Sequence, residues 1–216
     1  MAPYGESALL LSFRVQKASF GAERARQANA WVRACYQQLK DMPTPGMAAL
    51  VPAVEHLLVR LRHPGDGPAV VEWLLQQVPT LRHGVQYGRQ VVIPVRYGGE
   101  AGPDLEEVAR LHGLLPAEVI ALHCRPVYRV LMIGFLPGFA YLGFVDASIV
   151  TPRRHSPRLR VEAGSVGIAG WQTGVYPVAS AGGWKIIGRT SVALFDPRRA
   201  DPFLLHPGDE VRFQPL

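Results

Sequence analysis

From Val127 onward the sequence contains no stretch with helical periodicity. Short apolar runs separated by Pro and Gly take its place: YRVLMIGF, SVGIAGWQ, GVYPVA, WKIIGRT, VALFD and EVRFQ. Runs of this length, divided by residues that break regular structure, are typical of the strands of a β-barrel or β-sandwich. The pattern therefore predicts that this part of the chain is built from strands.

The residues before about 84 show a different pattern, in which strand and helix signals alternate. Apolar side chains recur every three or four residues over 21–40, as in an amphipathic helix, and Pro68 suits the first turn of a second helix. The expected elements are strands at 2–5 and 8–13, a helix at 21–40, strands at 47–54 and 56–62, and a helix at 68–78. This order predicts an α+β layer, an antiparallel sheet with two helices on one face.

A polar turn at 82–90 separates the two patterns. After it we expect a strand at 90–98, helices at 104–114 and 116–123, and then the strand-rich part. The sequence therefore predicts two domains, an α+β domain at 1–84 and a β-barrel domain at 85–216.

Charge and composition narrow the class of partner. With 23 Lys and Arg against 17 Asp and Glu the net charge is +6, which admits anionic partners but is not the balance of a nucleic-acid tail. The longest uncharged run, 130–145, is shorter than the roughly 20 residues that span a bilayer, and Pro137 and Gly138 interrupt it. The start of the chain lacks the pattern of a signal peptide. We expect a cytoplasmic protein that binds neither membrane nor nucleic acid, with Cys35 and Cys124 as free thiols.

Common metal and nucleotide motifs are absent from the sequence. The seven His are scattered without HxxxH or HExxH spacing, and no pair of cysteines accompanies them. There is no Walker loop, no GxSxG elbow and no GxGxxG after a strand. We therefore expect no bound metal, and any ATP must bind without a P-loop.

The segment 134–144, GFLPGFAYLGF, places aromatic side chains among residues that break regular structure, with no charged group or thiol. Leu136 to Phe139 fit a turn with Pro at its first central position and Gly at its second. The aromatic rings either wall a pocket or an interface between subunits, or fill the core. The predicted pocket wall consists of Phe135, Pro137, Phe139, Tyr141 and Trp184.

Two further segments carry groups that bind anions. TPRRHSPRLR, at 151–160, holds Arg153 and Arg158 in a loop that its prolines keep from forming a helix; it is either a solvated basic loop or a grip for carboxylate or phosphate. The Gly-rich stretch 162–190 permits tight turns close to a ligand, although such glycines also form ordinary barrel corners. Its candidate donors and acceptors are Gln172, Thr173, Tyr176, Ser180, Arg189 and Thr190.

His123 is the candidate catalytic residue. It ends a predicted helix just before the first strand of the strand-rich part. In that position it either complements the helix dipole or carries a proton at the mouth of the barrel.

Five motifs occur in order: GFLPGFAYLG (134–143), TPRRHSPR (151–158), AGSVGIAGWQTGVYP (163–177), GGWKIIGRT (182–190) and HPGDEVRF (206–213). Together with YGESALLLSF near the start and the segment 97–114, they resemble the signature of one family. That family comprises the B subunits of bacterial ATP-dependent 5-oxoprolinases (PxpB), the Kip-type kinase inhibitors and allophanate hydrolase subunit 1. The similarity extends over nearly the whole chain.

The resemblance implies a cyclophilin-like β-barrel as the second domain and one component of an ATP-dependent cyclic amide (lactam) hydrolase. Such proteins cleave 5-oxo-L-proline to L-glutamate together with KipA-like and LamB/YcsF-like subunits, so this chain alone is expected to be inactive. ATP with Mg²⁺ is then the co-substrate. The resemblance leaves two alternatives: a non-catalytic regulator that inhibits a sensor histidine kinase, and a subunit that hydrolyses allophanate or a urea-like amide.

For lactam cleavage, ATP is expected to phosphorylate the stable amide at its carbonyl oxygen, and the protein to position phosphate and ring. The expected roles are anion contact for Arg153, Arg158 and Arg189, ring orientation for Gln172, Thr173 and Tyr176, and proton transfer for His123.

Overall fold

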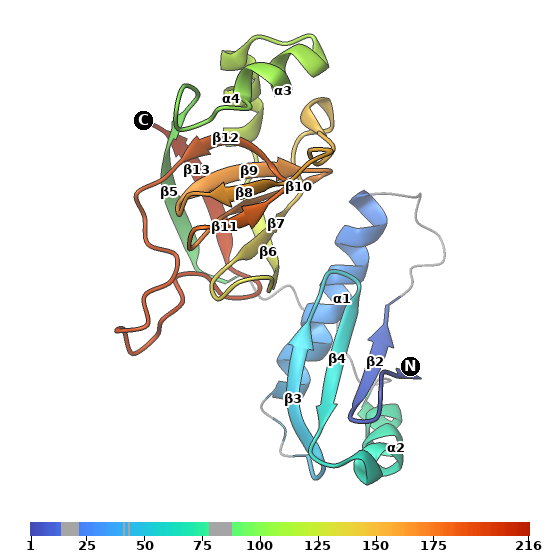
Figure 1. Ribbon diagram of the computed structural model, residues 1–216. Helices are drawn as coiled ribbons and strands as arrows, with labels where there is room; N and C mark the ends of the chain where they lie inside the picture. Colours follow the sequence, from blue (N-terminus) through green and yellow to red (C-terminus); the bar gives the residue numbers. More distant parts are fainter. Residues whose placement is uncertain (14–21, 41, 43, 78–87) are drawn as a thin grey trace. The chain divides into compact units, whose positions relative to one another are not determined.

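The structure is a computed structural model that describes residues 1–13, 22–40, 42, 44–77 and 88–216. Contacts within the chain divide it into two compact units, Met1–Gln86 and Tyr87–Leu216 (Figure 1). The predicted boundary near residue 84 lies outside the described residues, so the domain limits 1–84 and 85–216 stay a prediction.

The first unit is an antiparallel sheet with helices, as the sequence predicts. Its strands pair in the order β1-β2-β4-β3. The elements are β1 (Ala2–Pro3), β2 (Ala8–Ser12), α1 (Ala22–Lys40), β3 (Met47–Pro52), β4 (His56–Leu61) and α2 (Gly67–Gln77). The expected starts and ends of these elements therefore agree with the structure to within a few residues, wherever they fall on described residues.

One core holds the first unit together. Leu9 and Leu11 of β2 lie opposite Val59 and Leu57 of β4, so these four side chains share one face of the sheet. Buried side chains from both helices complete the same cluster: Val32, Cys35 and Leu39 of α1, and Val70 and Leu74 of α2. Both helices therefore cover the same face, which confirms the expected layer. Cys35 is a free thiol, and its burial raises its pKa to about 11.

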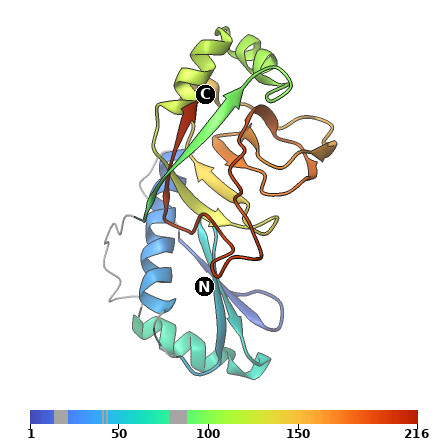
Figure 2. The same ribbon diagram turned by 90° about the vertical axis from the view of Figure 1, so that its left-hand side faces the viewer.

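The second unit is a closed barrel with strands in the order β10-β7-β6-β13-β5-β12-β9, in which β10 pairs with β9 to close the ring. Figure 2 shows the chain turned by 90° from the labelled view of Figure 1. All pairs are antiparallel except β13 with β5. The barrel strands are β5 (Gln90–Tyr97), β6 (Tyr128–Ile133), β7 (Ala140–Gly143), β9 (Ser165–Ala169), β10 (Gln172–Val175), β12 (Lys185–Arg189) and β13 (Glu210–Pro215). The expected barrel is confirmed, while its cyclophilin-like character stays a prediction.

Smaller elements cover the barrel. The helices α3 (Leu105–His112) and α4 (Pro116–Cys124) lie together beside one end of it, and their side chains Val108 and Val119 are buried in the barrel's own cluster (Figure 1). The strands β8 (Arg158–Val161) and β11 (Ser180–Gly182) pair with each other in a separate small sheet. Along β5, Ile93 and Val95 are buried while Val92 and Arg96 are exposed, the alternation expected of a barrel wall.

Within the described residues, no helix combines the length and apolar character needed to cross a bilayer.

Candidate functional site

His123 lies in the barrel core, and its imidazole joins a continuous chain of hydrogen bonds. Its side chain is completely buried and stacks on Phe213, with 4.7 Å between ring centroids. Nε2 lies 2.8 Å from the Thr173 hydroxyl, which donates its own proton to the Gly167 carbonyl at 3.0 Å. Because that hydroxyl can then only accept, Nε2 carries the imidazole proton. Nδ1 consequently accepts from the Tyr97 hydroxyl at 2.8 Å.

The chain of donors extends one step further, to Cys124, while burial keeps His123 neutral. The Cys124 thiol donates to the Tyr97 oxygen at 3.4 Å. Burial lowers the pKa of His123 to about 3, because a charged imidazole is unfavourable where water cannot reach it. The sequence leaves two interpretations of His123 open, interaction with the helix dipole and proton transfer at the mouth of the barrel; in the structure the side chain has no exposed surface. Its role in proton transfer stays a prediction.

Four of the five predicted pocket-wall residues, all but Pro137, meet with Tyr176 in what we call the aromatic cluster. Phe139 is its centre and makes edge contacts with four rings, at centroid distances between 4.8 and 5.5 Å. These four are Phe135, Tyr141, Tyr176 and Trp184. Phe139, Tyr176 and Trp184 are buried, so they fill a core, whereas Pro137 is exposed.

The turn at 136–139 has the predicted form. The Phe139 amide donates to the Leu136 carbonyl at 3.0 Å, and Gly138 has a φ of +81°. Phe135, just before the turn, has a φ of +71° and is 59% exposed. A bulky residue rarely adopts this conformation, and its ring lies at the open side of the aromatic cluster.

The basic loop at 151–160 is tied to a buried carboxylate that the sequence did not single out. Both terminal nitrogens of Arg158 donate to Asp104, at 2.8 and 2.7 Å, and Arg154 donates to the same carboxylate at 3.0 Å. The Ile186 amide adds a further bond at 2.6 Å. Burial alone would raise the pKa of Asp104, but the bonds from Arg158 and Ile186 and the arginine charges outweigh it and lower the pKa. Arg153 is exposed.

Asp104 precedes α3, where an acidic residue in the sequence indicates a helix cap. Its side chain makes no capping bond and accepts instead from Arg154 and Arg158 of the basic loop and from the Ile186 amide of β12. Asp104 thereby connects the start of α3 with β12 and the basic loop. No sequence signal separates this arrangement from an ordinary cap, because the partners lie about fifty and eighty positions away.

The contacts that the structure shows for Gln172 and Ser180 are strand pairing and a local hydrogen bond. Gln172 begins β10 and pairs with Gly143 and Ala169 through the backbone. The Ser180 hydroxyl donates to the neighbouring carbonyl of Ala181 at 3.1 Å. Both side chains are partly buried.

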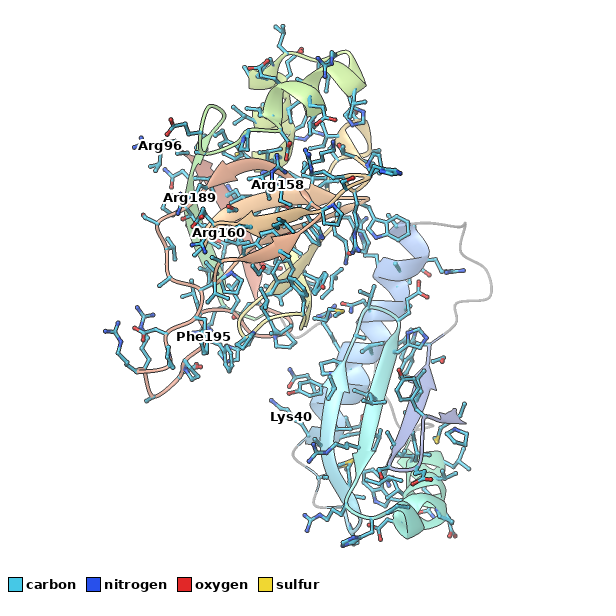
Figure 3. The ribbon with its side chains drawn as sticks, in the orientation of Figure 1. Lys40, Arg96, Arg158, Arg160, Arg189 and Phe195 are labelled. Atoms are coloured by element: carbon cyan, nitrogen blue, oxygen red, sulfur yellow. The ribbon has the colours of Figure 1, made fainter. Side chains whose placement is uncertain are left out.

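Arg189 and Thr190 line a hollow of about 950 Å³, which we call the β5–β12 hollow. Its walls are the ends of these two strands, the turn at 98–101, the turn at 163–164 and the segment 190–193. Arg96, which the sequence did not single out, stands directly opposite Arg189 in the strand register. Figure 3 shows the two arginines on the same side of the barrel. Among the described residues, no group of three or more His, Cys, Asp or Glu side chains gathers as a metal site would require.

Comparisons with known proteins give consistent results. A family model described as "Carboxyltransferase domain, subdomain C and D" matches residues 1–205. A protein of Bacillus subtilis (strain 168), named as the B subunit of 5-oxoprolinase, is 41% identical over 221 residues, which cover 97% of this chain and 89% of that protein. A protein of the same name from Escherichia coli O157:H7 is 46% identical over 192 residues, covering 88% of this chain and 86% of that protein.

Solved structures share the fold. The crystal structure of TTHA0988 superposes with a TM-score of 0.81 at 39% identity, over 97% of this chain and 40% of that chain. The present chain therefore spans less than half of that solved chain. The Kluyveromyces lactis urea carboxylase has a TM-score of 0.68 at 16% identity, over 97% of this chain and 21% of that chain. This distant likeness concerns the fold alone.

Proposed function

The chain belongs to the family of carboxyltransferase domains, subdomain C and D, that includes proteins named as 5-oxoprolinase B subunits. From that membership we propose that it is the B subunit of an ATP-dependent 5-oxoprolinase, which cleaves 5-oxo-L-proline to L-glutamate. The observation that carries the proposal is the 41% identity to the Bacillus subtilis protein of that name, which extends over 97% of the chain.

The chain is proposed to act with two other proteins in the cytoplasm. These are the KipA-like and LamB/YcsF-like subunits, and the isolated chain is expected to be inactive. ATP is a co-substrate, and Mg²⁺ accompanies it through its phosphates. ATP phosphorylates the lactam carbonyl oxygen and leaves as ADP; water then adds to the activated carbonyl carbon, the ring C–N bond breaks, and a second water releases phosphate. The protein's contribution is to hold phosphate and ring together.

The positions of the side chains sharpen the proposed roles. Arg153 and Arg189 are exposed and are the proposed anion contacts. Arg158 has its guanidinium occupied by Asp104, so its contribution is to hold the basic loop in place. Thr173 holds His123 through its hydroxyl inside the barrel. The proposed route for proton transfer by His123 is through Tyr97, which both contacts its imidazole and lines the β5–β12 hollow.

The test is reconstitution of the complex of three subunits. The chain is co-expressed with candidate KipA-like and LamB/YcsF-like proteins, the complex is purified, and L-glutamate release from 5-oxo-L-proline is measured with and without ATP. We expect release only with all three proteins and ATP. Absence of release in a stable complex of the three contradicts the proposal.

A parallel assay separates the alternatives. The same complex is given allophanate and urea in place of 5-oxo-L-proline, and the isolated chain is added to an autophosphorylating sensor histidine kinase. Turnover of allophanate or urea alone would reassign the substrate. Inhibition of the kinase by the isolated chain, without hydrolysis by the complex, would identify a regulator.

A further inference from the structure

Two arginines face each other across the β5–β12 strand pair. Arg96 and Arg189 are register partners in this antiparallel pair. Side chains of such partners project from the same face with Cβ atoms about 5 Å apart, and like charges in this relation destabilise a sheet. Both side chains are exposed, on the outer wall of the barrel.

Neither arginine is neutralised within the described residues. Arg96 makes no side-chain hydrogen bond or ion pair there, and Arg189 makes one bond, from Nε to the Ala163 carbonyl at 3.0 Å. Glu162 lies near enough to interact electrostatically with Arg189, but its carboxylate is bonded to Arg160 at 2.6 Å. Glu100 also lines the hollow, and no ion pair joins it to either arginine among the described residues. Within the described residues, neither arginine is therefore joined in an ion pair, although the hollow is also lined by Glu100 and by Leu216 with its terminal carboxylate.

Arg189 is held in a fixed orientation. Its Nε bond to Ala163 leaves the two terminal nitrogens without a protein acceptor in the part of the chain that the structure describes. The adjacent Gly164 accepts the Thr190 amide at 2.9 Å, and a Cβ at Gly164 would lie 2.1 Å from the Thr190 carbonyl oxygen. This close packing of turn against strand end fixes the backbone beneath the guanidinium. A pre-positioned guanidinium binds an oxyanion with little loss of side-chain entropy.

The hollow has further features of a ligand site. Its volume of about 950 Å³ falls in the range of small-molecule pockets. Pro177, Val192 and Ala193 provide apolar wall, while Thr190 and Ser191 provide hydroxyls. The Thr190 oxygen accepts the Val192 amide at 3.1 Å, which leaves its proton available to a ligand. A pair of cations beside apolar wall suits a small organic molecule that bears an oxyanion.

We propose that Arg96 and Arg189 form an oxyanion-binding site in the β5–β12 hollow, which takes a carboxylate or a phosphate group through both guanidinium groups. The described residues of this chain supply the site, so the isolated chain binds the anion. The proposal does not rest on the proposed function, because a component of an enzyme and a regulator can each use such a site.

The experiment is isothermal titration calorimetry of the full chain with four probes: inorganic phosphate, ATP, acetate and 5-oxo-L-proline. Binding of phosphate or ATP identifies a phosphate source, and binding of acetate or 5-oxo-L-proline identifies a carboxylate source. In either case Arg96→Gln and Arg189→Gln are expected to weaken binding about ten- to a hundredfold, the loss that follows from removing one charged hydrogen-bonding group.

Arg212→Gln is the matched control. Arg212 is an exposed barrel arginine on the neighbouring strand β13 and lies outside the hollow, so its loss changes the net charge by the same amount. The control is expected to bind like the unmodified chain. The proposal is overturned if no probe binds, if the Arg96 and Arg189 variants bind as the unmodified chain does, or if Arg212→Gln weakens binding equally. Each of these results is independent of the glutamate-release assay.

Discussion

Two groups of arginines on the same barrel have opposite surroundings. Arg154 and Arg158 converge on Asp104, whose side chain is 3% exposed and which also accepts the Ile186 amide. Arg96 and Arg189 are opposite each other in the register of β5 and β12, and no ion pair joins either of them to a carboxylate among the described residues. The first group is bonded to a buried carboxylate, whereas the second has no ion pair among the described residues.

The contrast shows that an arginine's role follows from what the fold places opposite it. Two segments distant in sequence, the basic loop and β12, supply donors to Asp104, so this carboxylate holds the start of α3, β12 and the basic loop together. Across β5 and β12 the register places charge against equal charge, which weakens the sheet unless an anion binds. We therefore expect the cluster around Asp104 to contribute to the stability of the fold, and the pair Arg96 and Arg189 to contribute to the binding of an anion.

The largest expected effect on the unfolding free energy comes from removing the Asp104 carboxylate, to which Arg154 and Arg158 are bonded. Asp104→Asn keeps the size of the side chain but removes its charge, leaving two arginines without a counter-ion. Loss of one partner from a buried ion pair typically costs 3–5 kcal/mol, and because the arginines are partly exposed we expect about 3 kcal/mol of unfolding free energy. The unfolding free energy is measured in urea, with hydrogen exchange of peptides from β12 as the probe of unfolding.

Glu162→Gln serves as its control. Glu162 also pairs with an arginine, Arg160, but both side chains are exposed to water. Loss of that pair is expected to leave barrel stability unchanged. Equal effects of the two substitutions would contradict the claim that the buried Asp104 carboxylate contributes more to stability than an exposed ion pair does.

The second effect concerns the closed hydrogen-bond chain around His123 and depends on pH. The folded-state pKa of His123 is about 3, below the roughly 6.5 of an unfolded His, so on acidification the unfolded chain takes up the proton first. Stability is therefore present above pH 6.5 and declines as the pH falls toward 3. Between pH 7 and 5 this one group accounts for a loss of about 2 kcal/mol.

The unfolding free energy of the unmodified chain and of His123→Gln is measured at pH 7, 6 and 5. The variant is expected to be less stable at pH 7 but to lose about 2 kcal/mol less on going to pH 5. His155→Gln, which removes an exposed imidazole, is the control and should keep the pH dependence of the unmodified chain. Parallel curves for the unmodified chain and His123→Gln would contradict the neutral, buried state of His123.

A third prediction tests the hydrogen-bond chain that runs from Cys124 through Tyr97 to His123. Tyr97→Phe removes the hydroxyl that donates to His123 and accepts from Cys124. We expect a loss of about 1 kcal/mol, the usual value for one hydrogen bond within a protein. Tyr4→Phe, at an exposed tyrosine, is the control and should have no effect on urea unfolding. A change in stability of similar size in both variants would show that the Tyr97 hydroxyl is not part of a closed chain.

The architecture was largely predictable from the sequence, because it depends on local patterns. The spacing of apolar residues over 21–40 predicts a helix directly. The short apolar runs after Val127, separated by Pro and Gly, predict strands in the same way. The turn at 136–139 was predictable for the same reason, since Pro and Gly restrict the backbone where they stand.

The candidate site was only partly predictable, because its groups depend on distant pairing. Asp104 resembles a helix cap in the sequence, and only the folded chain brings Arg158 to it. His123 stands at a helix end in the sequence, yet the helix places it inside the barrel. Arg189 was expected to contact anions, but Arg96 became visible only through the register of β5 with β12.

The smallest expected effect concerns the stability of the open pair itself. Arg96→Gln removes one of two like charges that face each other, so the unliganded chain should become more stable, by about 0.5 kcal/mol at low salt. Because the pair is exposed, the gain should vanish near 1 M NaCl, where the screening length falls to about 3 Å. Urea unfolding at about 20 mM and about 1 M NaCl, without phosphate or carboxylate buffers, measures both values.

Arg212→Gln again supplies the comparison, because its register partner on β5 is Val92 rather than an arginine. Its removal should give no salt-dependent gain. Arg189→Gln is the weaker test, since it also removes the bond to the Ala163 carbonyl and so loses part of what it gains. If Arg96→Gln destabilises the chain, or if its effect is the same at both salt concentrations, the two arginines do not repel each other. The contrast between this pair and the arginines bonded to Asp104 would then not hold.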